Sequence, residues 1–332
     1  MLNPNLKLNP KIWNDDVEML PIRHGFGEGL LKAAETDESI VGICADLTES
    51  TKMNLFADKF PKRFVQVGVA EQNLVTVASG MAAMGKFPFV SSYAMFSPGR
   101  NWEQIRTTIC YNDVPVVVAG SHAGISVGPD GGTHQALEDI ALMRVLPNMI
   151  VLTPCDAIEA RKATLAIAKL RKPAYIRLAR EKSPVITTEE TPFEIGKAQV
   201  LFETDGLAHV GVIACGALVH GAMRAAQKLE KEGIRVKVMN IGTIKPLDVN
   251  AIVALAKETK SLVTVEEHQI AGGLGSAVAE CLASTVPTPM EFVGMKDKYG
   301  ESGSPAELVE HFGMGTTAII EAIRRAVDRK QK

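Results

Sequence analysis

A glutamate stands at the point where an apolar stretch gives way to a helical pattern. The run 64–67 predicts a buried parallel strand, Gly68 permits a turn, and the pattern over 71–84 predicts a helix. Glu71 would then lie in the first helical turn, at the carboxyl end of a strand, where open α/β sheets bind their ligands. A carboxylate there also stabilises the helix dipole without any further role. The residues at the neighbouring strand ends must therefore decide between the two interpretations.

A glycine-rich segment, 120–135, holds two of the seven histidines and an aspartate. Glycine lets the backbone approach a ligand closely, and His122, Asp130 and His134 suit hydrogen bonding to hydroxyl groups and proton transfer near neutral pH. The spacing of the two histidines fits no usual zinc motif, which disfavours a metal site. A long loop without secondary structure is unusual in a compact domain, so this pattern favours a functional segment over a solvated loop.

Basic, hydroxyl and aromatic side chains are expected at the same sheet edge. Guanidinium forks and a hydroxyl are suited to binding the phosphate of a sugar. The candidates are Arg23, Ser50, Arg177 and Arg180. Each of them alone is more typical of a surface salt bridge. Tyr93 and Phe96 would ordinarily join the core, but they follow a predicted strand end, where their faces could sandwich a planar ring.

The order of the predicted elements is typical of an α/β protein with two doubly wound, largely parallel sheets. In the first half, strands are predicted over 40–44, 64–67, 87–91, 114–119, 149–152 and 174–178, and helices over 23–34, 71–84, 101–111 and 157–170. In the second half, strands are predicted over 209–214, 235–240 and 261–265, and helices over 218–231, 250–258 and 275–283. A Pro-, Thr- and Glu-rich stretch, 183–194, indicates a linker. We therefore expect two domains, 1–190 and 191–332.

Composition limits the possible partners and compartments. The 332 residues are 46% hydrophobic and 22% charged, with a net charge of −2, which gives no sign of a nucleic-acid or membrane partner. The five cysteines are dispersed and predict reduced thiols. No signal peptide is recognisable, and we expect a cytoplasmic protein. The glycines at 272–275 precede a predicted helix, where tight packing is a more typical role than anion binding.

These motifs resemble those of the transketolase family, and the resemblance covers nearly the whole chain. The matching stretches are 45–47, 68–72, 96–106, 128–135 and 178–180. They correspond only to the C-terminal part of a full-length transketolase, namely its pyrimidine-binding domain and its C-terminal domain. The loop motif with the upstream Ser121-His122 pair is fairly specific, whereas the stretch 69–72 is shared across many thiamine diphosphate enzymes.

The resemblance implies roles around the cofactor. Glu71 would hydrogen-bond to N1′ of the aminopyrimidine of thiamine diphosphate, which carries the carbanion chemistry. Phe96, with Tyr93, would stack on the pyrimidine. Asp46 would lie close to the cofactor and to a subunit interface.

The resemblance also implies roles around the substrate, in the transfer of a two-carbon ketol unit from a ketose phosphate, such as xylulose 5-phosphate, to an aldose phosphate. This is a reaction of the pentose phosphate pathway. The hydroxyls of the ketose donor would contact His122, Asp130 and His134, with His134 near the C1 hydroxyl. The substrate phosphate would be held by Arg23, Ser50 and Arg180.

Two departures from the family pattern bear on completeness. Pro98-Gly99 stand where larger transketolases have a third pocket aromatic. The Gly-Asp-Gly motif and the downstream Asn that bind diphosphate and Mg²⁺ in the family are also missing. Mg²⁺ needs such oxygen ligands, so another chain would have to supply them. The resemblance therefore implies a split transketolase, in which an N-terminal subunit supplies the ligands of Mg²⁺ and diphosphate. The cofactor would lie between the chains of a heterotetramer with two copies of each.

Three alternatives stay open. The β subunit of a 2-oxo-acid dehydrogenase shares the two-domain plan, and the stretch 242–248 fits either family, but the His122/Asp130/His134 segment favours a polyol phosphate. A 1-deoxyxylulose-phosphate synthase half is conceivable because Arg177 and Arg180 could both bind phosphate. A non-catalytic scaffold subunit is disfavoured because it would have no need of Glu71 and both histidines.

Overall fold

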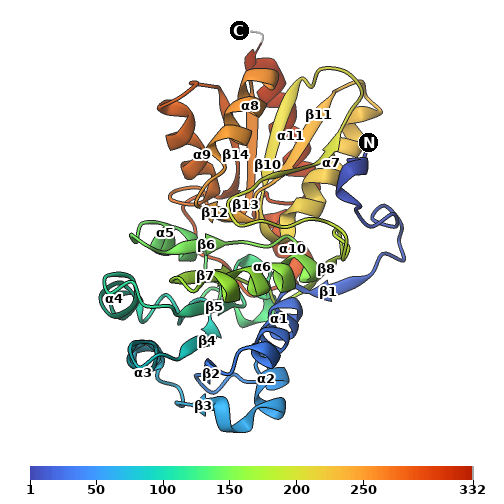
Figure 1. The fold of residues 1–332 in the computed structure, drawn as a ribbon. Helices are drawn as coiled ribbons and strands as arrows, with labels where there is room; N and C mark the ends of the chain where they lie inside the picture. Colours follow the sequence, from blue (N-terminus) through green and yellow to red (C-terminus); the bar gives the residue numbers. More distant parts are fainter. Residues whose placement is uncertain (331–332) are drawn as a thin grey trace.

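The computed structural model describes residues 1–330, which form two α/β units stacked one above the other (Figure 1). The first unit contains a seven-stranded sheet of order β12-β6-β7-β5-β4-β2-β3, and the second a five-stranded sheet of order β14-β13-β10-β11-β9. Both sheets are mostly parallel, with β12 and β9 antiparallel at their edges. The predicted fold class is confirmed.

The first unit follows the expected alternation of strands and helices. Its strands are β2 (Ile40–Cys44), β3 (Phe64–Gln66), β4 (Phe87–Tyr93), β5 (Val117–Ser121), β6 (Ile150–Leu152) and β7 (Ala174–Arg177). Its helices are α1 (Ile22–Thr36), α2 (Asn54–Lys59), α3 (Glu71–Ala83), α4 (Trp102–Gln104), α5 (Asp139–Arg144) and α6 (Ala157–Leu170). Every residue of β2 and β5 is buried, as expected for central parallel strands.

The second unit contains more elements than the sequence pattern predicts. Its strands are β9 (Gln199–Glu203), β10 (Val210–Ala214), β11 (Val236–Asn240), β13 (Leu262–Gln269) and β14 (Met290–Met295). Its helices are α7 (Val219–Glu230), α8 (Val249–Thr259), α9 (Leu274–Ala283), α10 (Pro305–His311) and α11 (Thr316–Lys330). The elements β9, β14, α10 and α11 were not anticipated.

Helix α1 forms despite three glycines because those glycines allow it to pack directly on α6. A Cβ at Gly25 would lie 1.7 Å from the carbonyl oxygen of Ala157, and one at Gly29 would lie 2.7 Å from Cβ of Thr164. The backbones of the two helices therefore approach too closely for a side chain at these positions. The intrinsic cost of glycine in a helix, about 1 kcal/mol each, is offset by this contact.

Two segments differ from their predicted conformation. The helix expected over 101–111 is the short α4 followed by a π-helix, Ile105–Cys110. The segment 120–135, expected as a loop without secondary structure, contains the 3-10 helix Ile125–Asp130, and most of its residues up to Gly128 are buried. Its glycines support this compact path because Gly124, Gly128 and Gly131 have positive φ angles.

The two units are interlocked by chain segments that cross between them. The N-terminal arm packs on the second unit: Leu2 forms an antiparallel β-bridge with Phe202 of β9, and Ile12 is fully buried in that unit's core. In the other direction, β12 (Thr243–Lys245) leaves the second unit and pairs with β6. The strands β1 (Met19–Pro21) and β8 (Lys182–Pro184) pair beside this junction. Among residues 1–330, no helix has the length and apolar character that a membrane crossing needs.

Candidate active site

Glu71 begins α3 at the carboxyl end of β3, as the sequence predicts, and its side chain is buried with only 2% of its surface exposed. Its Oε2 accepts a hydrogen bond from Nη1 of Arg100 at 2.8 Å, and its Oε1 lies 3.4 Å from the hydroxyl of Ser92. The carboxylate is thus held by one strong, charge-assisted contact. Its other oxygen keeps capacity for a further partner.

A row of rings begins at the end of β4. The rings of Tyr93 and Phe96 are stacked with 18° between their planes and 6.3 Å between their centroids. His122 stacks on Tyr93 with a centroid distance of 3.8 Å, and His134 meets Phe96 edge-on at 5.4 Å. The structure therefore brings these four predicted residues together. Their faces form a platform of the kind on which planar rings bind.

His122 directly follows β5 and is held as a neutral imidazole. Its Nε2 lies 2.7 Å from Nη1 of Arg23, which can only donate, so Nδ1 carries the proton and donates to the hydroxyl of Ser121 at 2.9 Å. Burial, followed by the nearby charges of Arg23, Arg180 and His134, lowers the pKa of His122 from 6.5 to about 3. The ring is therefore uncharged at neutral pH and acts as a hydrogen-bonding group.

Arg23 and Arg180 approach each other from α1 and from the end of β7. Burial and the charge of Arg180 lower the pKa of Arg23. The buried Nε of Arg23 has no hydrogen-bond partner in the described part of the chain. Arg180 donates to the carbonyl oxygen of Val127 at 2.6 Å and lies 3.7 Å from Glu181. Because the charge of one guanidinium group disfavours the charge of the other, an anion bound between them would be stabilised.

The remaining predicted residues lie on loops at this edge with fewer contacts. His134 is half-buried, and its Nδ1 bonds to the hydroxyl of Thr133 at 2.9 Å. Asp46, at a positive φ of 60° after β2, is exposed, and its backbone N–H donates to Gln66. Ser50 is half-buried and Asp130 is exposed. Within residues 1–330, no hydrogen bond joins the side chains of Asp46, Ser50 or Asp130 to the other predicted site residues.

Arg177 does not belong to this group, and its inclusion among the phosphate-binding candidates was wrong. It is only 7% exposed, and its Nε donates to Oδ2 of Asp139 at 2.8 Å. The same Asp139 oxygen accepts from the hydroxyl of Tyr175, and Nη2 of Arg177 donates to the carbonyl oxygen of Glu267. Arg177 therefore joins the two units of the chain and is not available to a substrate.

Sequence reasoning missed Arg100 and Asn101. Arg100 neutralises Glu71 and also lies over the ring of Phe96, 5.1 Å from its centroid. Asn101 donates to the carbonyl oxygen of Glu71 at 2.8 Å and to the hydroxyl of Ser97. A signal existed: a buried glutamate needs a cation or donors, and Arg100 lies four residues after Phe96.

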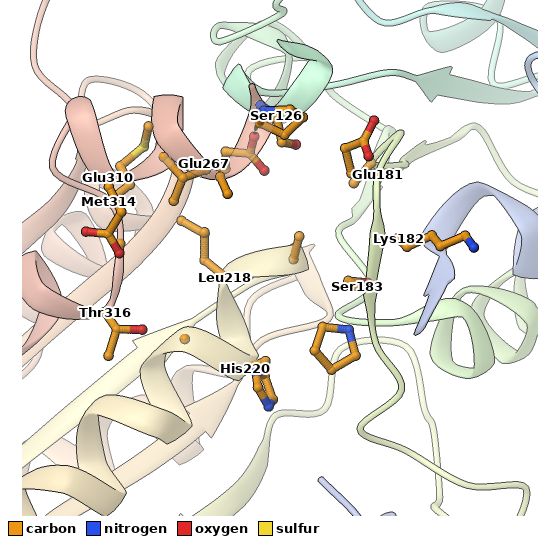
Figure 2. A pocket seen from close by; sticks show the side chains of 18 of the residues that line it. Ser126, Glu181, Lys182, Ser183, Leu218, His220, Glu267, Glu310, Met314 and Thr316 are labelled. Atoms are coloured by element: carbon orange, nitrogen blue, oxygen red, sulfur yellow. Dashed lines mark hydrogen bonds between the residues drawn. The ribbon is translucent and has the colours of Figure 1, made fainter. Parts of the chain in front are cut away.

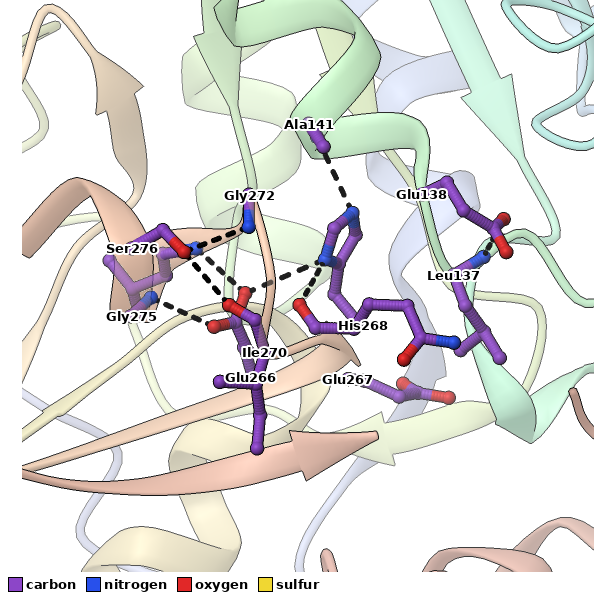
Figure 3. A network of polar contacts seen from close by, with 12 residues as sticks. Leu137, Glu138, Ala141, Glu266, Glu267, His268, Ile270, Gly272, Gly275 and Ser276 are labelled. Carbon is purple, nitrogen blue, oxygen red and sulfur yellow. Dashed lines mark hydrogen bonds and ion pairs between the residues drawn. The ribbon is translucent and has the colours of Figure 1, made fainter. Parts of the chain in front are cut away.

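The glycines at 272–275 serve packing, the role favoured from the sequence. A Cβ at Gly273 would lie 1.9 Å from Oε2 of Glu266. Glu266 accepts from the backbone N–H groups of Leu274 and Gly275 at 2.7 and 2.8 Å and so occupies the N-terminus of α9 (Figure 3). Burial raises its pKa to about 8. The chain itself thus supplies the acceptor at this helix terminus, and no place for an external anion remains there.

The residues at the sheet edge fit one half of a thiamine diphosphate site. The carboxylate of Glu71 and the rings of Tyr93 and Phe96 suit a hydrogen-bonding planar heterocycle. The ligands of a metal ion form the other half of such a site. Among the residues that the structure describes, no group of three or more histidine, cysteine or acidic side chains is arranged to hold a metal ion.

Comparisons with known proteins identify the family to which the two units belong. Residues 18–185 match "Transketolase, pyrimidine binding domain", and residues 196–319 match "Transketolase, C-terminal domain". The 6-deoxy-6-sulfo-D-fructose transketolase subunit SqwH of Clostridium sp. (strain MSTE9) is 38% identical over 93% of this chain and 95% of its own length. A subunit of the apulose-4-phosphate transketolase of Phocaeicola vulgatus is 35% identical over 91% of this chain and 96% of its own length.

A solved structure agrees with the sequence matches. A split-gene transketolase, described as an inactive beta4 tetramer, superposes with a TM-score of 0.87 and 41% identity, covering 94% of this chain and 99% of that chain. The chain covers at least 95% of the length of each of these two subunits and of the solved chain. The chain thus belongs to the transketolase family and comprises its pyrimidine-binding and C-terminal domains.

Proposed function

We propose that the chain is the C-terminal subunit of a split transketolase and transfers a two-carbon ketol unit from a ketose phosphate to an aldose phosphate. Thiamine diphosphate would bind between this chain and an N-terminal subunit, which would supply the ligands of its diphosphate and of Mg²⁺. The observation that carries the proposal is Glu71, a carboxylate 2% exposed at the carboxyl end of a parallel strand, beside an aromatic platform. A scaffold would gain nothing from burying this charge.

Each side chain at the site would have a distinct task in this reaction. Glu71 would hold a proton at N1′ of the pyrimidine, while Arg100 keeps the carboxylate in place. Tyr93 and Phe96 would support the ring. When bound, thiamine diphosphate supplies the carbanion chemistry that breaks the C2–C3 bond of the ketose. Asp46 would lie near the cofactor and the subunit interface.

The substrate would be held farther along the same edge. His122, neutral and fixed by Arg23, and His134 would bind donor hydroxyls, joined by Asp130. Arg23 and Arg180 would bind the phosphate, joined by Ser50. The unfavourable effect of the Arg180 charge on Arg23 supports this assignment, because an anion between them would relieve their repulsion. The sugar itself stays open, since the names of two relatives specify 6-deoxy-6-sulfo-D-fructose and apulose 4-phosphate.

The assembly would be a heterotetramer with two copies of each chain. The similar split-gene transketolase is described as an inactive beta4 tetramer, which supports a C-terminal chain that needs a partner for activity. The 1-deoxyxylulose-phosphate synthase alternative loses part of its basis because Arg177 is engaged by Asp139.

Activity measured with and without the partner tests the proposal. The purified chain would be assayed for ketol transfer with thiamine diphosphate and Mg²⁺, alone and mixed with a candidate N-terminal half. We expect activity only in the mixture. Activity of the chain alone would show that the diphosphate site is not missing, and a stable but inactive complex would favour the dehydrogenase or synthase alternatives.

The variant Glu71→Gln tests the central residue. It preserves the shape of the side chain but removes the charge, and we expect kcat of the assembled enzyme to fall by about 100-fold or more, as for a lost acid–base group. Size-exclusion chromatography should show the same assembly as the wild type. The exposed Glu38→Gln serves as the matched control and should retain full activity. Unchanged activity of Glu71→Gln would refute the assigned role.

A further inference from the structure

A cavity of about 570 Å³ lies between the two domains, away from the aromatic platform. Its walls come from the 3-10 helix Ile125–Asp130, from the segment that follows β7, from the start of α7 and from the region of α10 and the start of α11. Figure 2 shows the open space bounded by Ser126, Glu267, Leu218 and Glu181. A cavity of this size is within the range of small-molecule sites.

The polar end of the cavity is formed by Glu267 and Ser126. Glu267 is 3% exposed, and its Oε1 accepts from the backbone N–H of Ser126 at 2.6 Å. No donor reaches its Oε2 within residues 1–330, and the Ser126 hydroxyl is likewise buried without a partner in that range. A buried carboxylate with a single donor is costly. A ligand that donates hydrogen bonds here would satisfy both groups.

The rest of the lining determines the charge and polarity of such a ligand. The apolar wall includes Leu218, Pro305, Val309 and Met314. Three carboxylates line the cavity against one ammonium group, that of Lys182, which points away from Glu267 in Figure 2. The imidazole of His220, whose Nε2 donates to the carbonyl oxygen of Ile12 at 3.0 Å, adds no charge because burial lowers its pKa. The lining is therefore acidic at one end and apolar over much of its wall.

We propose that this cavity binds a small organic cation, an ammonium group on a compact apolar body, with the ammonium donating to Glu267 and Ser126. An anion would meet three carboxylates. A neutral molecule of the same shape would gain the apolar contacts but would add no positive charge beside the buried carboxylate. The site is separate from the residues that we assign to ketol transfer.

The cavity also adjoins the segments that carry the proposed substrate residues. Ser126 lies in the same 3-10 helix as Asp130, and Ala179 and Glu181 in the lining flank Arg180. Glu267 packs tightly against this helix, since a Cβ at Gly124 would lie 2.4 Å from its Oε1. A bound cation would therefore restrain residues 124–136. This makes the cavity an effector site that acts on the substrate-binding loop.

Three probes of one shape and different charge test the proposal. Benzylamine, which is an ammonium ion at pH 7, benzyl alcohol and benzoate would be titrated into the full-length chain by isothermal titration calorimetry. We expect benzylamine to bind at least ten-fold more tightly than the other two. Hydrogen–deuterium exchange should slow in residues 124–136 with benzylamine alone. Equal binding of the three probes, or none by benzylamine, would overturn the proposal.

Two variants locate the binding. Leu218→Trp fills the cavity and leaves the acidic end intact, whereas Glu267→Gln removes the charge but still accepts from the Ser126 N–H. Each should weaken benzylamine binding by ten-fold or more, and Glu38→Gln, at an exposed site, should not change it. Undiminished binding to a folded form of either variant places the cation elsewhere. These measurements of binding need no turnover. The cation proposal can therefore fail while the mixture with the partner shows ketol-transfer activity, and cation binding can be found even if that mixture is inactive.

Discussion

Two arginines three residues apart show how differently this chain treats similar charges. Arg177, the last residue of β7, has a carboxylate partner in Asp139 and donates to carbonyl oxygens of both units. Arg180 is partly exposed, and no carboxylate contacts it as closely: it donates to the carbonyl oxygen of Val127 at 2.6 Å, lies 3.7 Å from Glu181, and its charge acts on Arg23. We infer that a cation paired inside the chain supports the fold. A cation left beside another cation is available for a ligand.

The largest expected effect comes from removing Arg177 from its ion pair with Asp139. Arg177→Met would leave Asp139 buried without its counter-ion, and we expect the free energy of unfolding to fall by about 3–5 kcal/mol. Urea denaturation measures this change. The double variant Arg177→Met/Asp139→Asn should recover part of the loss, because no unpaired charge remains. Equal loss in both variants would show that the ion pair is not the source.

Substitution of Arg180 should change the activity of the enzyme and leave its stability unchanged. In the assembled enzyme, Arg180→Ala should raise KM for phosphorylated sugars by roughly 10-fold or more, the value of a lost charge-assisted hydrogen bond. KM for an unphosphorylated ketose should change much less. The urea midpoint should stay within experimental error of the wild type. An equal rise in KM for both substrates would contradict phosphate binding by Arg180.

His134 sharpens the comparison between two histidines at the same edge. His122 is fixed by Arg23 and Ser121, whereas His134 hydrogen-bonds to the hydroxyl of Thr133 and remains open to a donor sugar. His134→Ala should therefore reduce kcat/KM for the ketose donor by about 10-fold and leave the acceptor KM nearly unchanged, as for the loss of one hydrogen bond to substrate. Unaltered kinetics with xylulose 5-phosphate would refute this placement.

The last prediction concerns a second buried network. Burial, together with the charge of Asp156, raises the pKa of Glu159 from 4.5 to about 7. The Glu159 carboxyl group thus binds its proton more tightly in the folded state than in the unfolded state. Its contribution to the free energy of unfolding is therefore fully present below pH 4.5 and is lost as the pH rises through 7. Glu159→Gln should remove that pH dependence. Urea midpoints of both proteins across this range provide the measurement.

The variant Glu159→Gln can keep its hydrogen bonds. Asn240 donates to Oε1 of Glu159 at 2.8 Å, and its own Oδ1 is buried without a partner in residues 1–330. A rotated Asn240 amide could accept from the new amide, while the backbone N–H of Cys155 keeps an oxygen acceptor. A difference in midpoint that stays constant with pH would contradict the titration of Glu159.

Much of the site follows from strand order, which the sequence pattern predicts. Glu71, Tyr93, His122 and Arg180 each come at or just after the end of a parallel strand, and such ends share one sheet edge. Their meeting could therefore be expected without coordinates. The roles assigned to them stay predictions.

Partners that lie far away in sequence could not be predicted in this way. Arg177 and Arg180 have the same residue type and nearly the same position, and only the placement of Asp139 on α5 separates their roles. The same holds for Arg100, whose contact with Glu71 depends on the turn after Phe96. Strand β14 was missed because it is only half-buried over its first three residues, which blurs the apolar pattern.

Strand β12 has a consequence for any attempt to divide the chain. It covers the edge of β6, so a fragment that ends near residue 190 would leave the hydrogen-bonding groups of β6 open. Open strand edges pair with other chains. Such a fragment should precipitate or form intermolecular sheets, even though it holds every residue that we place in the active site. The smallest portion that stays monodisperse must extend beyond Lys245.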